Sequence, residues 1–238
     1  MSPLSTAEIA ARRDEVLSRI ARACERAGRD PLRVSLLAVT KSHPAETVRR
    51  AALAGMTLFG ENRVAEGVHK IQALGQEFPQ LVWRLIGPLQ TNKAKPALQY
   101  FSVIESLDRE RLAARLEGLL AAQDKVFPVL LEVNLGGETT KSGVSPGEVE
   151  ALAASALACP HLEVRGLMAV PPLGDDPEQA RPYFRQLKEI RDRLADRFGK
   201  AFAELSMGMT HDFEVAVEEG ATEVRVGTAL FGLRRPSE

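Results

Sequence analysis

The stretch VSLLAVTKSHP, residues 34–44, decides the fold. Its first six residues are almost continuously apolar, which is typical of a strand buried on both faces of a parallel sheet. The turn that follows, residues 40–44, contains no glycine. Because an open doubly wound sheet usually carries a glycine-rich dinucleotide-binding turn after its first strand, this turn favours a different parallel architecture.

The same alternation of short apolar strand and amphipathic helix recurs along the chain. A helix predicted at residues 6–27 precedes the first strand, and Asp108 is predicted to cap the helix after the fourth. Strands are predicted at residues 34–39, 57–59, 81–86, 101–104, 127–133, 164–170, 204–206 and 223–226. Eight strand signals in 238 residues match the length of about 250 residues typical of a (β/α)₈ barrel. We therefore predict an α/β fold, a (β/α)₈ TIM barrel with an extra N-terminal helix, as a single domain over residues 1–238.

The composition argues against several classes of function. The formal net charge is −1, with 45% hydrophobic and 26% charged residues, which is ordinary for a globular protein. A near-zero charge argues against nucleic acid as the main partner, although it allows a local phosphate pocket. Cys24 and Cys159 belong to no metal-binding motif, so we predict no metal site. Because no signal peptide or bilayer-spanning run is visible, we expect a cytoplasmic protein with no membrane partner.

Lys41 lies two residues after the end of the first apolar strand. An amine that projects from an apolar wall has a lowered pKa, because burial disfavours the ammonium. A neutral amine is a nucleophile that forms Schiff bases with aldehydes. The simpler alternative is a lysine that closes a strand and reaches water, and Lys41 taken alone favours that alternative.

Polar residues collect at the ends of the predicted strands, where barrels build their active sites. Asn62 and Asn134 follow the second and fifth strands. Hydroxyl residues and glycines follow the seventh and eighth, namely Ser206, Gly208, Gly227 and Thr228. Barrels often bind phosphate with these last two loops, and glycine lets backbone N–H groups approach an anion. Two such loops favour a phosphate site over simple turns.

The other polar candidates are less specific. Arg225 interrupts the apolar eighth strand, and alternation alone does not decide whether it points into the barrel or toward an outer helix. His211, beside the seventh loop, suits either a ligand contact or a helix cap. Lys141 suits either an anion contact or a mobile surface loop. The sixth predicted strand is mostly core, and within it Met168 is a candidate for the pocket wall. Three acids read as cap or surface groups rather than catalytic acids: Asp108, Glu132 and Glu163.

Ordered motifs along most of the chain resemble the pyridoxal phosphate homeostasis protein family. They are AVTK (38–41), FGENR (59–63), IGPLQTNK (86–93), VN (133–134), KSG (141–143), RGLMA (165–169), LSMGMT (205–210) and VRVGTALFG (224–232). Two departures are visible. Arg84 stands where a histidine is common, and His211 occupies a variable position that could alter the pocket mouth.

The resemblance implies a barrel of the alanine racemase N-terminal domain type that holds pyridoxal 5′-phosphate (PLP) as a Schiff base, an aldimine, on Lys41. It maps Arg225 onto an arginine that faces the pyridine nitrogen, Asn62 onto a residue near the ring, and the last two loops onto the phosphate site. The cofactor-binding residues that we expect are Lys41, Asn62, Met168, Ser206, Met207, Arg225, Gly227 and Thr228.

The arginine indicates restrained chemistry. PLP withdraws electrons best when its ring nitrogen is protonated, and an arginine can only donate a hydrogen bond to that nitrogen. We therefore expect a carrier for intracellular PLP homeostasis and amino-acid balance, without robust catalysis. PLP-requiring apo-enzymes are its expected recipients.

Two alternatives are a PLP-dependent fold-type III enzyme such as an amino-acid racemase, and a PLP-free Schiff-base aldolase. Related racemases take a second base from a C-terminal domain. This sequence stops soon after the eighth strand, and its two tyrosines, Tyr100 and Tyr183, are not at strand ends. These observations favour the carrier, and we expect a monomer.

Overall fold

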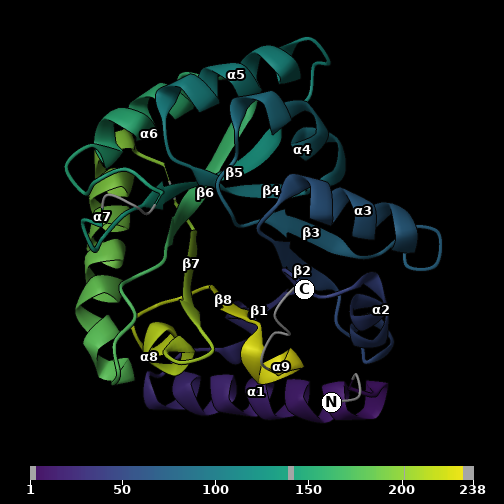
Figure 1. Ribbon diagram of the computed structural model, residues 1–238. Coiled ribbons are helices and arrows are strands. Elements are labelled where there is room, and N and C mark those ends of the chain that lie inside the picture. Colours follow the sequence, from purple (N-terminus) through teal and green to yellow (C-terminus); the bar gives the residue numbers. More distant parts are fainter. Residues whose placement is uncertain (1–3, 139–141, 201, 233–238) are drawn as a thin grey trace.

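The computed structural model describes residues 4–138, 142–200 and 202–232. Within them, eight parallel strands close into a barrel in chain order, and the last strand pairs with the first (Figure 1). The strands are β1 (Ser35–Val39), β2 (Leu58–Glu61), β3 (Val82–Leu85), β4 (Val103–Leu107), β5 (Phe127–Val133), β6 (Leu162–Ala169), β7 (Glu204–Met209) and β8 (Glu223–Val226). The predicted (β/α)₈ barrel is therefore confirmed.

Helices surround the barrel, and α1 lies beside α8 and α9 (Figure 1). The α-helices are α1 (Thr6–Arg26), α2 (Ala45–Leu53), α3 (Val64–Leu74), α4 (Ala94–Tyr100), α5 (Glu110–Ala121), α6 (Val149–Leu157), α7 (Arg181–Phe198), α8 (Phe213–Glu218) and α9 (Thr228–Phe231). Within the described residues, three short 3₁₀ turns accompany them: η1 (Pro31–Arg33), η2 (Thr91–Lys93) and η3 (Pro177–Ala180). In the part of the chain described, no helix combines the length and apolarity needed to cross a bilayer.

The first helix matches its prediction closely. Ser5 caps it through a reciprocal pair of hydrogen bonds with Glu8, an arrangement that satisfies N–H groups at a helix start. The fifth helix differs from its prediction. Residue Arg109 occupies its N-cap position without a side-chain cap, and Asp108 instead forms an ion pair with Arg109.

Alternation along each strand separates two environments. Val224 and Val226 of β8 belong to the core between barrel and helices, whereas Arg225 is buried on the inner side. The inside of the barrel holds a small apolar cluster of Val103, Leu130 and Met168. The inside of the barrel also holds a network of charged side chains. Such networks are uncommon inside a protein, because a charge removed from water is costly unless it is paired.

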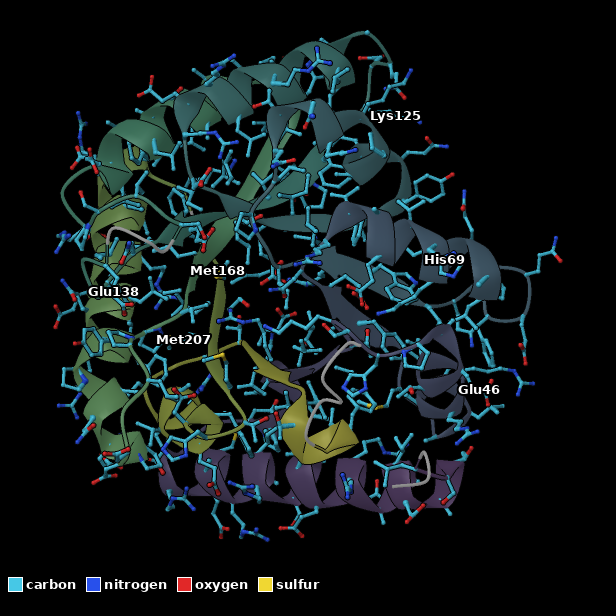
Figure 2. All side chains as sticks on the ribbon, in the orientation of Figure 1. Glu46, His69, Lys125, Glu138, Met168 and Met207 are labelled. Atoms are coloured by element: carbon cyan, nitrogen blue, oxygen red, sulfur yellow. The ribbon has the colours of Figure 1, made fainter. Side chains whose placement is uncertain are left out.

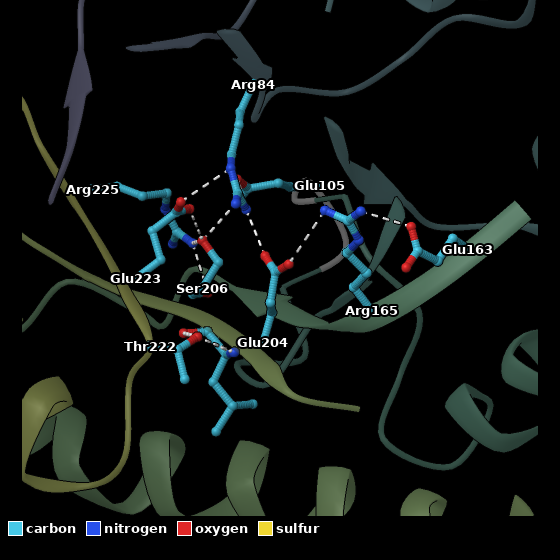
Figure 3. Close-up of polar contacts among 10 residues, drawn as sticks. Arg84, Glu105, Glu163, Arg165, Glu204, Ser206, Thr222, Glu223 and Arg225 are labelled. Carbon is cyan, nitrogen blue, oxygen red and sulfur yellow. Dashed lines mark hydrogen bonds and ion pairs between the residues drawn. The ribbon is translucent and has the colours of Figure 1, made fainter. Parts of the chain in front are cut away.

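The charged network is centred on Arg84 (Figure 3). Its guanidinium lies 2.7 Å from Glu204, 3.2 Å from Glu223 and 3.4 Å from Glu105. Burial, followed by repulsion from Glu105, raises the pKa of Glu223 well above its usual range. Arg84 is thus a structural cation of the barrel interior, which it reaches from β3.

Strand β7 runs three residues beyond its predicted end at Ser206. Its pairing with β8 shifts register between Ser206 and Met209, which marks a bulge. Gly208 within it has φ +92°, and a Cβ there would lie 2.5 Å from the Cβ of Ala216. The Ser-Met-Gly run is therefore an irregular strand that needs glycine, and the loop at its end begins at Thr210.

Candidate functional site

A cavity of about 880 Å³ opens at the C-terminal ends of the strands. Its lining includes five residues that were predicted to bind a cofactor: Lys41, Asn62, Arg225, Gly227 and Thr228. These residues come from β1, β2 and β8 or from the positions directly after them. A parallel barrel places all these strand ends at one rim, so residues distant in sequence meet in a single site.

A buried cluster fixes the backbone on both sides of Lys41. The Lys70 ammonium donates hydrogen bonds of 2.7 Å to the Thr40 carbonyl and to the carboxylates of Glu61 and Glu66. Thr40 Oγ1 donates to Glu61 at 2.6 Å, and the Ser42 N–H donates to Glu66 at 2.6 Å. Lys41 therefore extends into the cavity from a turn that is anchored immediately before and after it.

Arg225 points into the barrel, which decides the orientation that the sequence pattern left open. It is 3% exposed. Its Nη1 donates to the carbonyl and hydroxyl oxygens of Ser206, and its Nη2 donates to the carbonyl of Ala169, each at 2.7 Å. These acceptors are neutral oxygens, so they hold the guanidinium in place without cancelling its charge.

Three predicted cofactor residues lie away from the cavity. Ser206 is fully buried and donates to Glu105 at 2.6 Å (Figure 3). Met207 packs in the core outside the barrel, and Met168 packs inside it against Val103 and Leu130. Figure 2 labels both methionines. None of the three lines the cavity. Because β7 continues to Met209, the prediction placed Ser206 too close to the rim, and the hydroxyl residue of this loop at the cavity is Thr210.

The loops after β7 and β8 meet at one side of the cavity. Thr210 and Thr228 both line it, and Thr210 Oγ1 accepts a 3.4 Å hydrogen bond from the N–H of Ala229. A Cβ on Gly227 would lie 3.2 Å from the carbonyl oxygen of Val39, so glycine permits this close approach to β1. Hydroxyls together with backbone N–H groups form a donor set suited to an anion.

Glu132 is a cavity residue that the sequence interpretation missed. It is 6% exposed rather than at the surface, and its Oε1 accepts a 2.7 Å hydrogen bond from Ser142. Burial, reinforced by the charge of Asp108, raises the pKa of Glu132 to about 7 against the opposing effects of Ser142 and Arg225. The available signal was an acid within the otherwise apolar strand at residues 127–133.

The rim of the cavity contains exposed groups. His211 lines it and is exposed, consistent with the predicted place at the pocket mouth. Arg19 of α1 and Glu214 of α8 form a 2.8 Å ion pair there, and Leu173 is 79% exposed. The remaining candidate, Lys141, lies outside the described residues.

Comparison with known proteins gives consistent matches. Residues 12–235 match the family model described as alanine racemase, N-terminal domain. A protein of Aquifex aeolicus named pyridoxal phosphate homeostasis protein is 47% identical over 224 residues, which cover 94% of this chain and 97% of the relative. A Pseudomonas aeruginosa protein with the same name is 43% identical over 220 residues, covering 92% and 93%.

A solved structure extends the likeness to three dimensions. It is PipY of Synechococcus elongatus with PLP bound, which is 36% identical, with a TM-score of 0.83. The match covers 94% of this chain and all of PipY. The segment matched by the family model contains all eight strands and every cavity residue named above.

Proposed function

Because this chain belongs to the pyridoxal phosphate homeostasis protein family, whose domain is that of the alanine racemase N-terminus, we propose that it binds PLP in the barrel cavity. Its role is then to hold and release the cofactor within the cell, in support of PLP homeostasis and amino-acid balance. The bound cofactor supplies an aldehyde that captures amines and a ring that withdraws electrons.

The residues of the cavity suit the chemical parts of this cofactor. Lys41 supplies an amine for the aldehyde. Thr210, Gly227 and Thr228 supply hydroxyl and N–H donors for the phosphate, and Arg225 supplies a fixed donor for the ring nitrogen. The observation that carries the proposal is that these groups line one cavity of about 880 Å³.

Lys41 is the residue through which we propose that the protein holds PLP covalently. It lies in the cavity that also contains the anion-binding donor set, so a phosphate held there would keep the aldehyde near the amine. Tethering of this kind raises the effective concentration of the reacting groups. The anchored turn around Lys41 limits the freedom of the amine further.

Arg225 supports a carrier rather than a vigorous catalyst. An arginine donates to a ring nitrogen but does not accept its proton, so it disfavours the protonated ring that PLP enzymes use. Arg225 itself is held by neutral oxygens of Ser206 and Ala169. We propose that PLP-requiring apo-enzymes receive the cofactor and that the loaded protein lacks robust turnover.

A transfer assay tests this proposal. Purified protein is loaded with PLP, desalted, and mixed with a PLP-requiring apo-enzyme. We expect PLP to remain with the protein through desalting, and the activity of the recipient to be restored in proportion to the loaded protein added. The loaded protein alone should not racemise common amino acids. Failure to retain PLP would contradict the binding proposal, and sustained racemisation that Lys41→Ala abolishes would contradict the carrier role.

A further inference from the structure

Glu132 lies in the cavity without a role in the function proposed above. We propose that Glu132 is a ligand-contacting acid that makes binding of the phosphorylated cofactor dependent on pH, an inference that rests on the proposed function. It holds a proton when the anionic ligand is bound, and its loss of that proton weakens binding. The residue would therefore act as a local control on how firmly the cofactor is held.

The two carboxyl oxygens of Glu132 have different surroundings. Oε1 accepts the hydrogen bond from Ser142, whereas Oε2 is buried and has no hydrogen-bond partner among the described residues. A buried polar atom without a partner costs free energy. The Glu132 side chain lines the cavity, so a rotation of the carboxyl group would present this atom to a ligand there.

The backbone around Glu132 is built to hold this arrangement. The carbonyl of Glu132 accepts a 2.9 Å hydrogen bond from the N–H of Val144, and Asn134 donates to the carbonyl of Val144 at 2.8 Å. Gly143, which directly precedes Val144, has φ +99°, and a Cβ there would lie 2.8 Å from the Asn134 nitrogen. Ser142 is thus fixed beside the carboxyl group by a turn that needs glycine at the next position.

The charges that face Glu132 come from several elements. Asp108, directly after β4, raises its pKa, whereas Arg225 of β8 and the Ser142 hydroxyl lower it. The neighbour on β6, Met168, is apolar. Lys41, His211, Arg19 and Glu214 line the same cavity. Burial is the largest effect, and the pKa of about 7 lies within the physiological range.

The sign of the effect follows from the charge of the ligand. Below pH 7 the protonated carboxyl group can donate to an oxygen of the ligand, and above pH 7 the carboxylate repels a phosphate dianion. Binding should therefore be accompanied by retention or uptake of a proton. For one coupled proton, affinity falls by at most about tenfold for each pH unit above the pKa of the free site.

The test measures the dissociation constant for PLP from pH 6 to pH 9 by equilibrium dialysis, in the wild type and in Glu132→Gln. The two proteins differ only at residue 132, so the ratio of the two constants reports the effect of the Glu132 carboxyl group. We expect this ratio, wild type over variant, to rise at least fivefold between pH 6 and pH 9. Titration calorimetry in two buffers at pH 8 should show more protons taken up by the wild type.

Two further variants make the result specific. Ser142→Ala removes a hydrogen bond that lowers the pKa of Glu132, so the pH-dependent fall in affinity should move to higher pH. Glu214→Gln changes an acid of the same cavity that already pairs with Arg19. The ratio of the wild-type dissociation constant to that of this variant should not change with pH.

The outcomes distinguish this inference from the function on which it rests. PLP binding by the wild type with a pH-independent ratio to Glu132→Gln, and equal proton uptake, would overturn the role of Glu132 alone. If Glu132→Gln does not fold, an unchanged pH dependence in Ser142→Ala would overturn it instead. Absence of PLP binding at every pH would overturn the proposed function together with this inference.

Discussion

At the scale of single residues, the charge of Arg225 is the feature that gives the cavity its electrostatic character. Its guanidinium is buried and held by neutral oxygens, so an anionic ligand gains from it more than from a solvent-exposed cation. Burial raises the pKa of both Glu132 and Asp212, and the positive charge of Arg225 opposes that rise. One arginine therefore acts on the pKa of both of these acids.

Replacing Arg225 by glutamine should weaken PLP binding. A hydrogen bond to a charged group contributes about 1.5–3 kcal/mol, which corresponds to roughly a 10- to 100-fold higher dissociation constant. Equilibrium dialysis at pH 7 measures this change, and Arg197→Gln, which alters an exposed pair with Glu150, is the matched control. Equal affinities for the two variants would show that Arg225 does not contact the ligand.

Residues at strand ends could be placed in the cavity from the sequence, whereas residues near a bulge could not. Lys41, Asn62 and Thr228 follow clear apolar runs, and a parallel barrel brings such positions to one rim. Ser206 lies deeper in the barrel than its pattern indicated, because serine and glycine usually signal the end of a strand, while here they form part of an irregular one. Glu132 was missed because periodicity does not distinguish the inner from the outer face.

At the scale of an element, the Lys70 cluster connects α3 to the end of β1. Lys70 and Glu61 are almost completely buried, with side chains 3% and 0% exposed. Burial raises the pKa of Glu61, and Lys70 and Thr40 oppose that change. The cluster is therefore a buried ion pair whose partners also hold the backbone that carries Lys41.

Lys70→Met should destabilise the fold and slow the attachment of PLP. Removing one member of a buried pair costs about 3–5 kcal/mol, which predicts a fall in Tm of roughly 10 °C for a protein of this size. Calorimetry measures the first effect, and the rate at which absorption changes after PLP addition measures the second. Adding Glu61→Gln should restore part of the stability but not the rate. An unchanged rate in Lys70→Met would refute the positioning role.

At the scale of the whole molecule, the barrel has a polar interior beneath its cavity. Arg84 of β3 meets carboxylates of β4, β7 and β8 there, and the same network reaches Ser206, which Arg225 holds (Figure 3). The strand pattern predicted the barrel, because eight apolar runs alternate with helices. It could not predict this network, since its members lie far apart in sequence and each reads as an isolated charge in an apolar strand.

The central claim is that this barrel holds PLP through Lys41, and absorption spectroscopy during PLP titration tests it most directly. The wild type should develop the absorption band of lysine-bound PLP, and so should Lys93→Ala, which removes an exposed lysine that does not line the cavity. Lys41→Ala should not develop the band, although its fold remains intact by circular dichroism. An equal band in Lys41→Ala, or no band in the wild type, would contradict the account.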